Sequence, residues 1–445
     1  MKTNLRKSLS IAAVAALFFS CKPQIDVPAP QRGDLDVTKY VAIGNSMAAG
    51  YADNALYRQA QITSYPNIVA EQFKLIGGGE FKQPLVDASS VGVGALENAR
   101  YVLAPVTDCM GATSLAPVPS AQMGDLTIFN PVQGPFNNMA IPGLKAITTV
   151  YPGYGNPMNG PNNYNPFFTR IASDLQNSSV LSDAAAQQPS FFSLSVGQDD
   201  IFTYALSGGT KDAITPVSGQ PGYGFDGSVG AIVSTLTANK AKGVLLNIPY
   251  LNSMPYFTTV PFNGLMLDQA NAAALSAAYA PLGISFQPGA NAFIIEDDNA
   301  PGGMRQIQQS EMILLTVPQD SLKCAGWGSM KPIPDRYVLA SNEITLITTA
   351  IDAYNEVLHN IATVNGLAYV DVNAFMTKTR TGIMYNGVGM NTQFVTGGIF
   401  SLDGINLTPK GNALLANEII RSLNAKYKSR IPEVDANRYA GIIFP

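Results

Sequence analysis

The chain reads Lys39-Tyr40-Val41-Ala42-Ile43-Gly44-Asn45-Ser46-Met47-Ala48-Ala49-Gly50 where its first apolar run meets a tight turn. Apolar residues at successive positions are typical of a parallel strand that is covered on both faces. The serine that follows would stand at the carboxyl end of this strand, where α/β proteins bind ligands. A helix starting there would offer N–H groups and a favourable dipole to an oxyanion. Taken alone, the stretch also fits an ordinary capped helix start.

Further strands and helices alternate along the chain. Strands are expected at Phe191 to Val196, Val244 to Ile248 and Ala368 to Val372. Helices are expected at Pro66 to Phe73, opened by Ser64 or Tyr65, at Asn342 to Val364, and from Pro409 with Thr408 as its N-cap. This alternation predicts an α/β fold with a doubly wound parallel sheet.

The segments between these elements are long and irregular. Residues 144–168 are rich in Gly, Pro, Asn and Tyr, and we expect such insertions to decorate one α/β core rather than to form a separate domain. The run Glu296-Asp297-Asp298 precedes Asn299-Ala300-Pro301-Gly302-Gly303. It predicts a hairpin loop, and the alternative is a Ca²⁺ site.

The composition excludes several classes of protein. The 445 residues include 27 Lys and Arg and 31 Asp and Glu, a net charge of −4, with 46% hydrophobic and 13% charged residues. Disorder requires low hydrophobicity with high charge, and nucleic-acid binding requires basic patches. The composition and net charge of this chain fit neither class. One His and three scattered Cys cannot form a Cys/His zinc site. We therefore expect a globular protein, as a monomer, with no metal or cofactor and no nucleic-acid partner.

The first 21 residues have the pattern of a lipoprotein signal peptide. Basic residues precede an apolar stretch, Leu9 to Phe19, that is too short to span a bilayer, and Ser20 and Cys21 follow. A small residue before Cys is where bacterial lipoprotein precursors are cut and lipidated, and acyl chains on Cys21 would anchor the protein stably to a membrane. We expect a tether over residues 22–36, a folded domain over 37–445, and an outer-membrane lipoprotein on the periplasmic or surface face. The alternative is an ordinary secretory signal with an incidental Cys.

Two cysteines are left once Cys21 is lipidated. Outside the cytoplasm, spare cysteines usually pair. We therefore expect a disulfide between Cys109 and Cys324, and the alternative is two buried thiols.

Three more short blocks accompany the Ser46 turn. They read Asn138-Met139-Ala140-Ile141-Pro142-Gly143, Ser195-Val196-Gly197-Gln198-Asp199-Asp200 and Ser401-Leu402-Asp403-Gly404-Ile405-Asn406-Leu407-Thr408-Pro409. In order and content the blocks resemble the GDSL-type SGNH hydrolases, in particular a group of long bacterial lipoproteins, over nearly the whole mature chain. The resemblance implies a three-layer, doubly wound, flavodoxin-like fold and ester hydrolysis.

The resemblance also implies a role for each site residue. Ser46 stands at the nucleophile position, Asp403 at that of the acid which orients the His, and the oxyanion donors are Ser46, Gly143 and the third-block Asn. Here Asp199 occupies the Asn position and Asn406 the His position. An amide does not accept a proton near neutral pH, and an ionised carboxylate would repel an oxyanion.

The sequence therefore predicts a catalytically impaired SGNH-like lipoprotein whose pocket binds an acyl or acetylated-glycan ligand. The alternative is an active serine esterase that uses Ser46 with a non-standard base. Asp199 could be that base if a dry site raises its pKa. His359, on the flank of the expected helix at Asn342 to Val364, is expected at the surface or its boundary rather than at the site.

Overall fold

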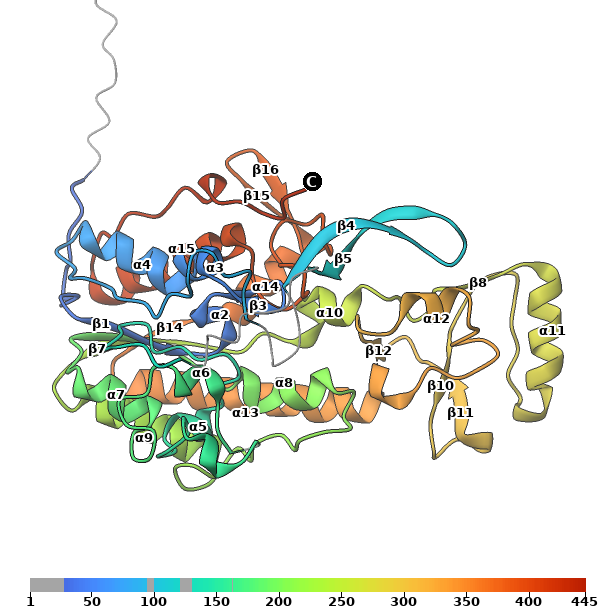
Figure 1. Cartoon of the computed structure of the whole chain (residues 1–445), viewed down its shortest axis with the longest axis horizontal. Coiled ribbons are helices and arrows are strands. Elements are labelled where there is room, and N and C mark those ends of the chain that lie inside the picture. Colours follow the sequence, from blue (N-terminus) through green and yellow to red (C-terminus); the bar gives the residue numbers. More distant parts are fainter. Residues whose placement is uncertain (1–27, 94–99, 121–129, 162) are drawn as a thin grey trace, which may run out of the picture. The chain divides into compact units, whose positions relative to one another are not determined.

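A four-stranded parallel sheet forms the centre of the fold (Figure 1). The computed structural model describes residues 28–93, 100–120, 130–161 and 163–445. The strands are β1 (Tyr40–Gly44), β6 (Phe191–Ser195), β7 (Lys242–Leu246) and β14 (Ala368–Val370), hydrogen-bonded in that order and all parallel. Each overlaps one of the expected apolar runs. The prediction of an α/β fold with a parallel sheet is therefore confirmed.

A fifth extended segment lies beside β1 on its other edge. The N–H of Ala42 donates to the carbonyl of Asn137 at 2.8 Å, and the N–H of Met139 donates to the carbonyl of Ala42 at 2.8 Å. The N–H of Ile141 continues the pattern by donating to the carbonyl of Gly44 at 2.9 Å. The chain therefore places residues 137–141, β1, β6, β7 and β14 side by side in that order.

Helices lie on both faces of the sheet (Figure 1). On one face are α4 (Tyr65–Lys74) and α15 (Pro409–Tyr427), and on the other are α7 (Val180–Ala186), α9 (Phe225–Thr237) and α13 (Ser341–Val364). The expected N-cap is present at α15, where Thr408 Oγ1 accepts the N–H of Gly411 at 3.0 Å. Proline in the first turn of α4 and α15 suits a position whose N–H has no helical partner. All three expected helices are confirmed.

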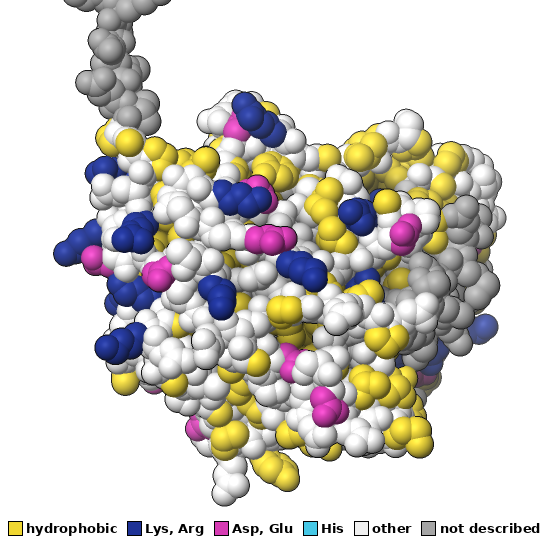
Figure 2. Space-filling view, turned by 60° about the vertical axis from the view of Figure 1, so that its left-hand side comes forward, with side chains coloured by type: hydrophobic (Ala, Val, Ile, Leu, Met, Phe, Trp, Pro, Cys, Tyr) yellow, Lys and Arg dark blue, Asp and Glu magenta, His cyan; other side chains and the backbone are white. Residues whose placement is uncertain are grey.

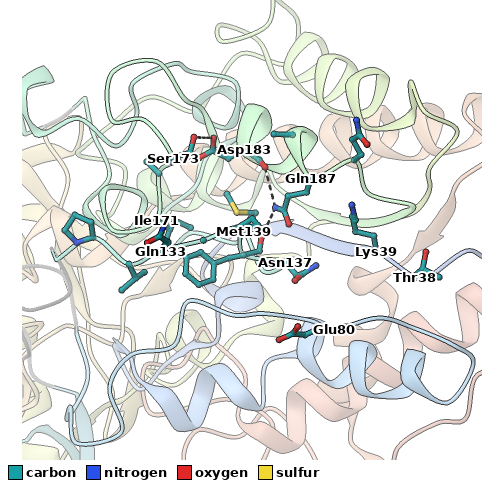
Figure 3. Close-up of a pocket in the computed structure, with 18 residues that line it drawn as sticks. Thr38, Lys39, Glu80, Gln133, Asn137, Met139, Ile171, Ser173, Asp183 and Gln187 are labelled. Atoms are coloured by element: carbon teal, nitrogen blue, oxygen red, sulfur yellow. Dashed lines mark hydrogen bonds between the residues drawn. The ribbon is translucent and has the colours of Figure 1, made fainter.

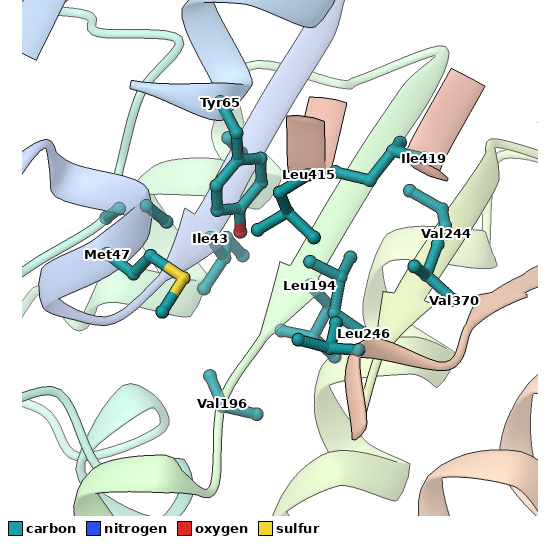
Figure 4. Close-up of a cluster of buried hydrophobic side chains, with 14 of the residues drawn as sticks. Ile43, Met47, Tyr65, Leu194, Val196, Val244, Leu246, Val370, Leu415 and Ile419 are labelled. Carbon is teal, nitrogen blue, oxygen red and sulfur yellow. The ribbon is translucent and has the colours of Figure 1, made fainter. Parts of the chain in front are cut away.

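The core packs the sheet against the helices on both of its faces (Figure 4). Ile43, Leu194 and Leu246 of neighbouring strands are almost fully buried, as are Leu415 and Ile419 of α15 on the upper face. On the lower face, α13 buries a stripe at three- and four-residue spacing that comprises Ile347, Ile351, Tyr354 and Leu358. Burial of this apolar surface is the main term that stabilises the sheet.

An insertion between β7 and α13 has its own apolar core. Its elements are β8 (Leu265–Leu267), α11 (Gln269–Tyr279), β9 (Gly289–Asn291), β10 (Ile294–Glu296), β11 (Met304–Gln306), β12 (Met312–Ile313), α12 (Gln319–Lys323) and β13 (Val338–Leu339). The strands β10 and β11 form an antiparallel hairpin whose loop carries Asp297 in an ion pair with Arg305. The hairpin predicted for Glu296 to Gly303 is thus confirmed.

A second hairpin joins this insertion through a disulfide. Strands β4 (Tyr101–Thr107) and β5 (Thr113–Pro119) form a long arm. Cys109 at its tip is bonded to Cys324, at the end of α12, with the two Cα atoms 6.4 Å apart. An ion pair of 2.9 Å between Lys323 and Asp108 lies alongside.

The remaining elements are short and surround the sheet. They are α2 (Ser46–Ala49), β2 (Tyr51–Ala52), β3 (Ala55–Leu56), α3 (Arg58–Ile62), α5 (Ala146–Thr149), α6 (Pro166–Thr169), α8 (Gln198–Leu206), α10 (Pro255–Thr258), α14 (Val372–Thr381), β15 (Ile383–Tyr385) and β16 (Val388–Met390).

The folded unit begins earlier than the sequence indicated. Residues Gln31–Pro445 form one compact unit. The N–H of Arg430 donates to the carbonyl of Gln31 at 2.8 Å, and Leu35 is buried. The last residues of the segment expected as a tether, 31–36, therefore belong to the fold. The expected lipidation site, Cys21, lies outside the described residues.

The surface is largely uncharged. In Figure 2, Lys, Arg, Asp and Glu side chains are spread over the face shown, with wide uncharged areas between them. This distribution matches the low charged fraction of 13%. Within the described ranges, no helix is both long and apolar enough to cross a membrane.

Neighbouring residues of α13 test the account of the core. Ile347 is fully buried and Leu346 is 52% exposed. We expect Ile347→Ala to lower the free energy of unfolding by about 2–5 kcal/mol, and Leu346→Ala to change it by less than about 0.5 kcal/mol. Urea unfolding followed by circular dichroism measures both. Equal effects of the two substitutions would contradict the packing described.

Candidate functional site

Ser46 lies where the chain turns sharply from β1 into α2. Asn45 is the N-cap residue, and the helix ends after one turn at Gly50, whose φ is +79°. Gly44 makes this turn possible, because a Cβ there would lie 2.6 Å from the Cβ of Ala48. The turn therefore presents Ser46 at the carboxyl end of β1, as the sequence predicted.

The carboxyl end of β6 brings a second polar segment to the same place. Gly44 pairs with Ser195, so the chains leaving β1 and β6 emerge level with each other. Gln198 and Asp199 open α8, and the side-chain amide of Asn45 donates to Gln198 Oε1 at 3.0 Å. This hydrogen bond ties the Ser46 turn to the turn that carries Asp199.

Gly143 approaches Ser46 from the extended segment beside β1. Its backbone N–H donates to Ser46 Oγ at 3.4 Å, and its φ of +77° is in the left-handed region that favours glycine. Asn165 holds the turn from behind, because its Nδ2 donates to the carbonyl of Pro142 at 2.8 Å. The geometry suits an N–H donor to an oxygen held at Ser46.

Asp403 and Asn406 form a hydrogen-bonded pair on the loop before α15. Asn406 Nδ2 donates to Asp403 Oδ2 at 2.9 Å, and the backbone N–H groups of Ile405 and Asn406 donate to Asp403 Oδ1 at 2.9 and 2.8 Å. Both side chains are buried, at 8% and 6% exposure. Asp403 thus orients the amide of Asn406 as a triad acid would orient an imidazole.

A tight turn between β2 and β3 completes the surroundings of Asp403. Asp53 and Asn54 have φ values of +53° and +62°, the pattern of a two-residue hairpin turn in which Asp and Asn are favoured. The N–H of Asn54 donates to Asp403 Oδ2 at 3.3 Å. Leu402 donates its N–H to Asp53 Oδ1 at 2.9 Å, so the turn also holds the loop that carries Asp403.

The site residues that the sequence singled out line one cavity. Its volume is about 420 Å³, within the usual range of roughly 300–1,000 Å³ for small-molecule sites. The polar lining comprises Asn45, Ser46, Asn54, Gly143, Asn165, Gln198, Asp199, Asp403 and Asn406, and the rest is mainly apolar: Tyr51, Val93, Pro142, Pro166, Phe167, Phe202, Leu206 and Ile405. The cavity can therefore hold a ligand with a polar group at the Ser46 end and an apolar remainder.

Burial changes the protonation of Asp199. The pKa of its carboxyl group is raised to about 7, mainly by removal from water and also by the neighbouring Asp200, whereas Lys145 opposes the change. Burial also raises the pKa of Asp200 to about 6, against a hydrogen bond of 2.6 Å that Asp200 accepts from the N–H of Ala146. Asp199 is therefore largely a neutral acid below pH 7, and a neutral acid can donate a hydrogen bond. The repulsion expected from Asp199 thus applies only above that pH.

Within the part of the chain that the structure describes, Ser46 Oγ is not hydrogen-bonded to a proton acceptor. Among the described residues, the hydrogen bond that reaches Ser46 Oγ comes from the N–H of Gly143, and none joins Ser46 Oγ to Asn406 or Asp199. His359 is exposed on α13 and packs edge-on against Tyr369, with ring centroids 5.1 Å apart. His359 therefore lies at the surface, as predicted, and does not line the cavity.

A larger hollow of about 980 Å³ lies at the opposite, amino end of β1 (Figure 3). Some of its polar side chains are hydrogen-bonded within the hollow. Ser173 Oγ donates to Asp183 at 2.6 Å, and Gln187 Nε2 donates to the carbonyl of Phe136 at 2.8 Å. The smaller cavity remains the candidate site because it combines a hydroxyl, an N–H donor and a buried carboxyl group.

Neither a protein-family model, a curated protein nor a solved structure matches this chain. The site is accordingly assigned from its own geometry.

Sequence reasoning missed several residues of this site. Asn165 anchors the Gly143 turn, Asn54 donates to Asp403, and Phe167 and Phe202 form part of the apolar wall. The pair Asn165-Pro166 is typical of a helix N-terminus, and Asp53-Asn54 is typical of a turn. Neither pair indicates which distant residue it contacts.

The raised pKa of Asp199 predicts a pH-dependent stability. Between about pH 4 and pH 7 the folded chain keeps a proton on Asp199 that an unfolded Asp, with a pKa of 3.8, has released. The free energy of unfolding therefore falls as the pH rises through this window. We expect Asp199→Asn to be more stable than wild type by about 1–3 kcal/mol at pH 8 and closely similar at pH 4.

Urea unfolding at the two pH values measures this difference, and Asp298→Asn, at an exposed position, is the matched control. A stabilisation by Asp199→Asn that is equally large at pH 4 would contradict a proton held by Asp199.

Proposed function

We propose that this chain is an outer-membrane lipoprotein with an SGNH-type fold that binds an acyl-containing or acetylated ligand beside Ser46 and hydrolyses esters poorly. The single observation that carries the proposal is the hydrogen bond between Asn406 and Asp403. It places an amide, which cannot accept a proton near pH 7, where the resemblance requires an imidazole.

The sheet supports the fold part of this proposal. Counted along the chain, the five parallel segments stand in the spatial order 2-1-3-4-5, the order of flavodoxin-like, doubly wound sheets. Such folds bind ligands outside the carboxyl ends of the strands, at the point where the strand order reverses. The reversal here lies between β1 and β6, the strands that lead to Ser46 and Asp199.

The cavity supports binding rather than turnover. Ser46 Oγ and the N–H of Gly143 are placed as a nucleophile and an oxyanion donor would be, with an apolar wall behind them. Loss of a triad His costs on the order of 10⁶ in kcat in a serine protease. The pocket can therefore retain recognition of an acyl group after the chemistry is lost.

The proposed membrane attachment rests on the sequence around Cys21, whose preceding apolar stretch and small residue match a lipoprotein signal. What the cavity and the sheet indicate does not depend on membrane attachment.

Restoring two residues should restore hydrolysis. In Asn406→His with Asp199→Asn, an imidazole could keep the hydrogen bond to Asp403 and supply the missing proton acceptor, and an amide would supply the oxyanion donor at every pH. We expect hydrolysis of p-nitrophenyl butyrate to rise by at least about 10²-fold over wild type.

The matched control is the same double variant with Ser46→Ala, in which the gain should vanish. A folded double variant that stays inert would show that the pocket lacks the geometry proposed. Wild-type turnover of about 1–10³ s⁻¹ that disappears in Ser46→Ala would instead establish the alternative, an active serine esterase with an unusual base.

A further inference from the structure

The polar end of the cavity contains two buried oxygen atoms that have no hydrogen-bond partner among the described residues. They are Asn45 Oδ1 and Asp199 Oδ2, and both residues line the cavity. A buried polar atom without a partner costs about 1–3 kcal/mol, which a ligand can recover. This end of the cavity is therefore the place for the polar head of a ligand.

Besides these two oxygens, this end of the cavity carries several hydrogen-bond donors. The N–H of Gly143 and the hydroxyl of Ser46 can both donate to a ligand oxygen, and Asp199 can donate while it is protonated. The oxygens of Asp403 already accept four hydrogen bonds, from the backbone N–H groups of Asn54, Ile405 and Asn406 and from the Asn406 side chain. The open positions are thus suited to an acceptor with two oxygens.

The charges near Asp199 determine what that acceptor can be. Asp200, on the same helix, raises the pKa of Asp199. Lys145, which directly precedes α5, lowers the pKa of Asp199, but the Lys145 ammonium group is also 3.8 Å from the carboxylate of Asp212. Tyr154 lies close enough for the charge of Asp199 to raise its own pKa, and Asp403 lines the same cavity. Among the described residues that line the cavity, none is Lys or Arg. The negative charge of an anionic ligand head would therefore be balanced by a proton on Asp199 and not by a Lys or Arg side chain.

We infer that the cavity takes a free carboxylic acid with an apolar chain, such as a fatty acid, whose head shares a proton with the buried, unpartnered carboxyl group of Asp199. This inference rests on the proposed function, because it names the ligand class of the same cavity. Two adjacent carboxyl groups in a dry site hold one proton between them, since both cannot ionise. The apolar wall, which includes Val93, Phe167 and Leu206, would contact the chain.

The shared proton gives the binding a defined pH dependence. A fatty acid is ionised above about pH 5, so it binds to the protonated form of Asp199, and ionisation of Asp199 then opposes binding. We expect the affinity for decanoate to fall about thirtyfold between pH 6 and pH 8.5, with uptake of about one proton per ligand at pH 8. Decanol has no charge and should show less than about a threefold change.

The experiment is calorimetric titration of the full chain, carrying Cys21→Ser so that no lipid is attached, with decanoate and with decanol. In Asp199→Asn the amide donates at every pH, so decanoate binding should become independent of pH. The matched control is Asp200→Asn, which should keep the loss of affinity but move it to lower pH because a like charge is removed.

Decanoate and decanol binding with equal, pH-independent affinity would overturn the shared proton and leave the proposed ligand pocket standing. A decanoate profile that is unchanged in Asp199→Asn would also overturn it, because the proton would then belong to another group. Absence of binding by decanoate, decanol and methyl decanoate at every pH would remove both this inference and the binding of long acyl chains from the proposed function.

Discussion

The hydrogen bond from Asn406 Nδ2 to Asp403 Oδ2, 2.9 Å long, is the interaction on which the functional account depends. Asp403 is surrounded by N–H donors, so its carboxylate is satisfied without a cation and fixes the direction of the Asn406 side chain. In a Ser-His-Asp triad the same position holds a group that takes the serine proton. Here the position is also held by a hydrogen bond to Asp403, but the side chain is an amide, which does not take up a proton. Ser46, Asp403 and Asn406 thus line one cavity, and the side chain that Asp403 orients does not accept a proton.

Asp199 makes the polar end of the same cavity sensitive to pH. Burial beside Asp200 keeps its carboxyl group protonated to about pH 7, so that it acts as a donor in mildly acidic solution and as a repelling charge in alkaline solution. A neutral carboxylic acid that donates a hydrogen bond in an apolar site has a precedent in ketosteroid isomerase. In the proposed function the two residues therefore have different effects: Asn406 leaves the site without a proton acceptor, whereas Asp199 makes ligand binding depend on a proton.

Much of the fold could be predicted because the signals are local. The runs at β1, β6, β7 and β14 are short, apolar and β-rich, and α4 and α15 both begin with a proline in the first turn. The position of Ser46 also followed from local sequence, since a strand followed by a turn ends at the carboxyl edge of a sheet. The N-terminal boundary of the folded unit could not be predicted from local sequence. Gln31 is hydrogen-bonded to Arg430, about 400 residues away, and no local pattern indicates this contact. The contacts of Asn54 and Asn165, and the burial that protonates Asp199, likewise depend on segments far apart in the chain.

The most direct test of the central claim is the rate at which a fluorophosphonate labels Ser46 in the wild-type chain, measured by intact mass. This reagent reports the activation of the serine hydroxyl without requiring knowledge of a substrate. We expect no adduct during an incubation that labels an active serine esterase completely, because among the described residues no base is hydrogen-bonded to Ser46 Oγ. Rapid, stoichiometric modification that is absent from Ser46→Ala would contradict it, and would mean that a competent base lies within hydrogen-bond reach of Ser46.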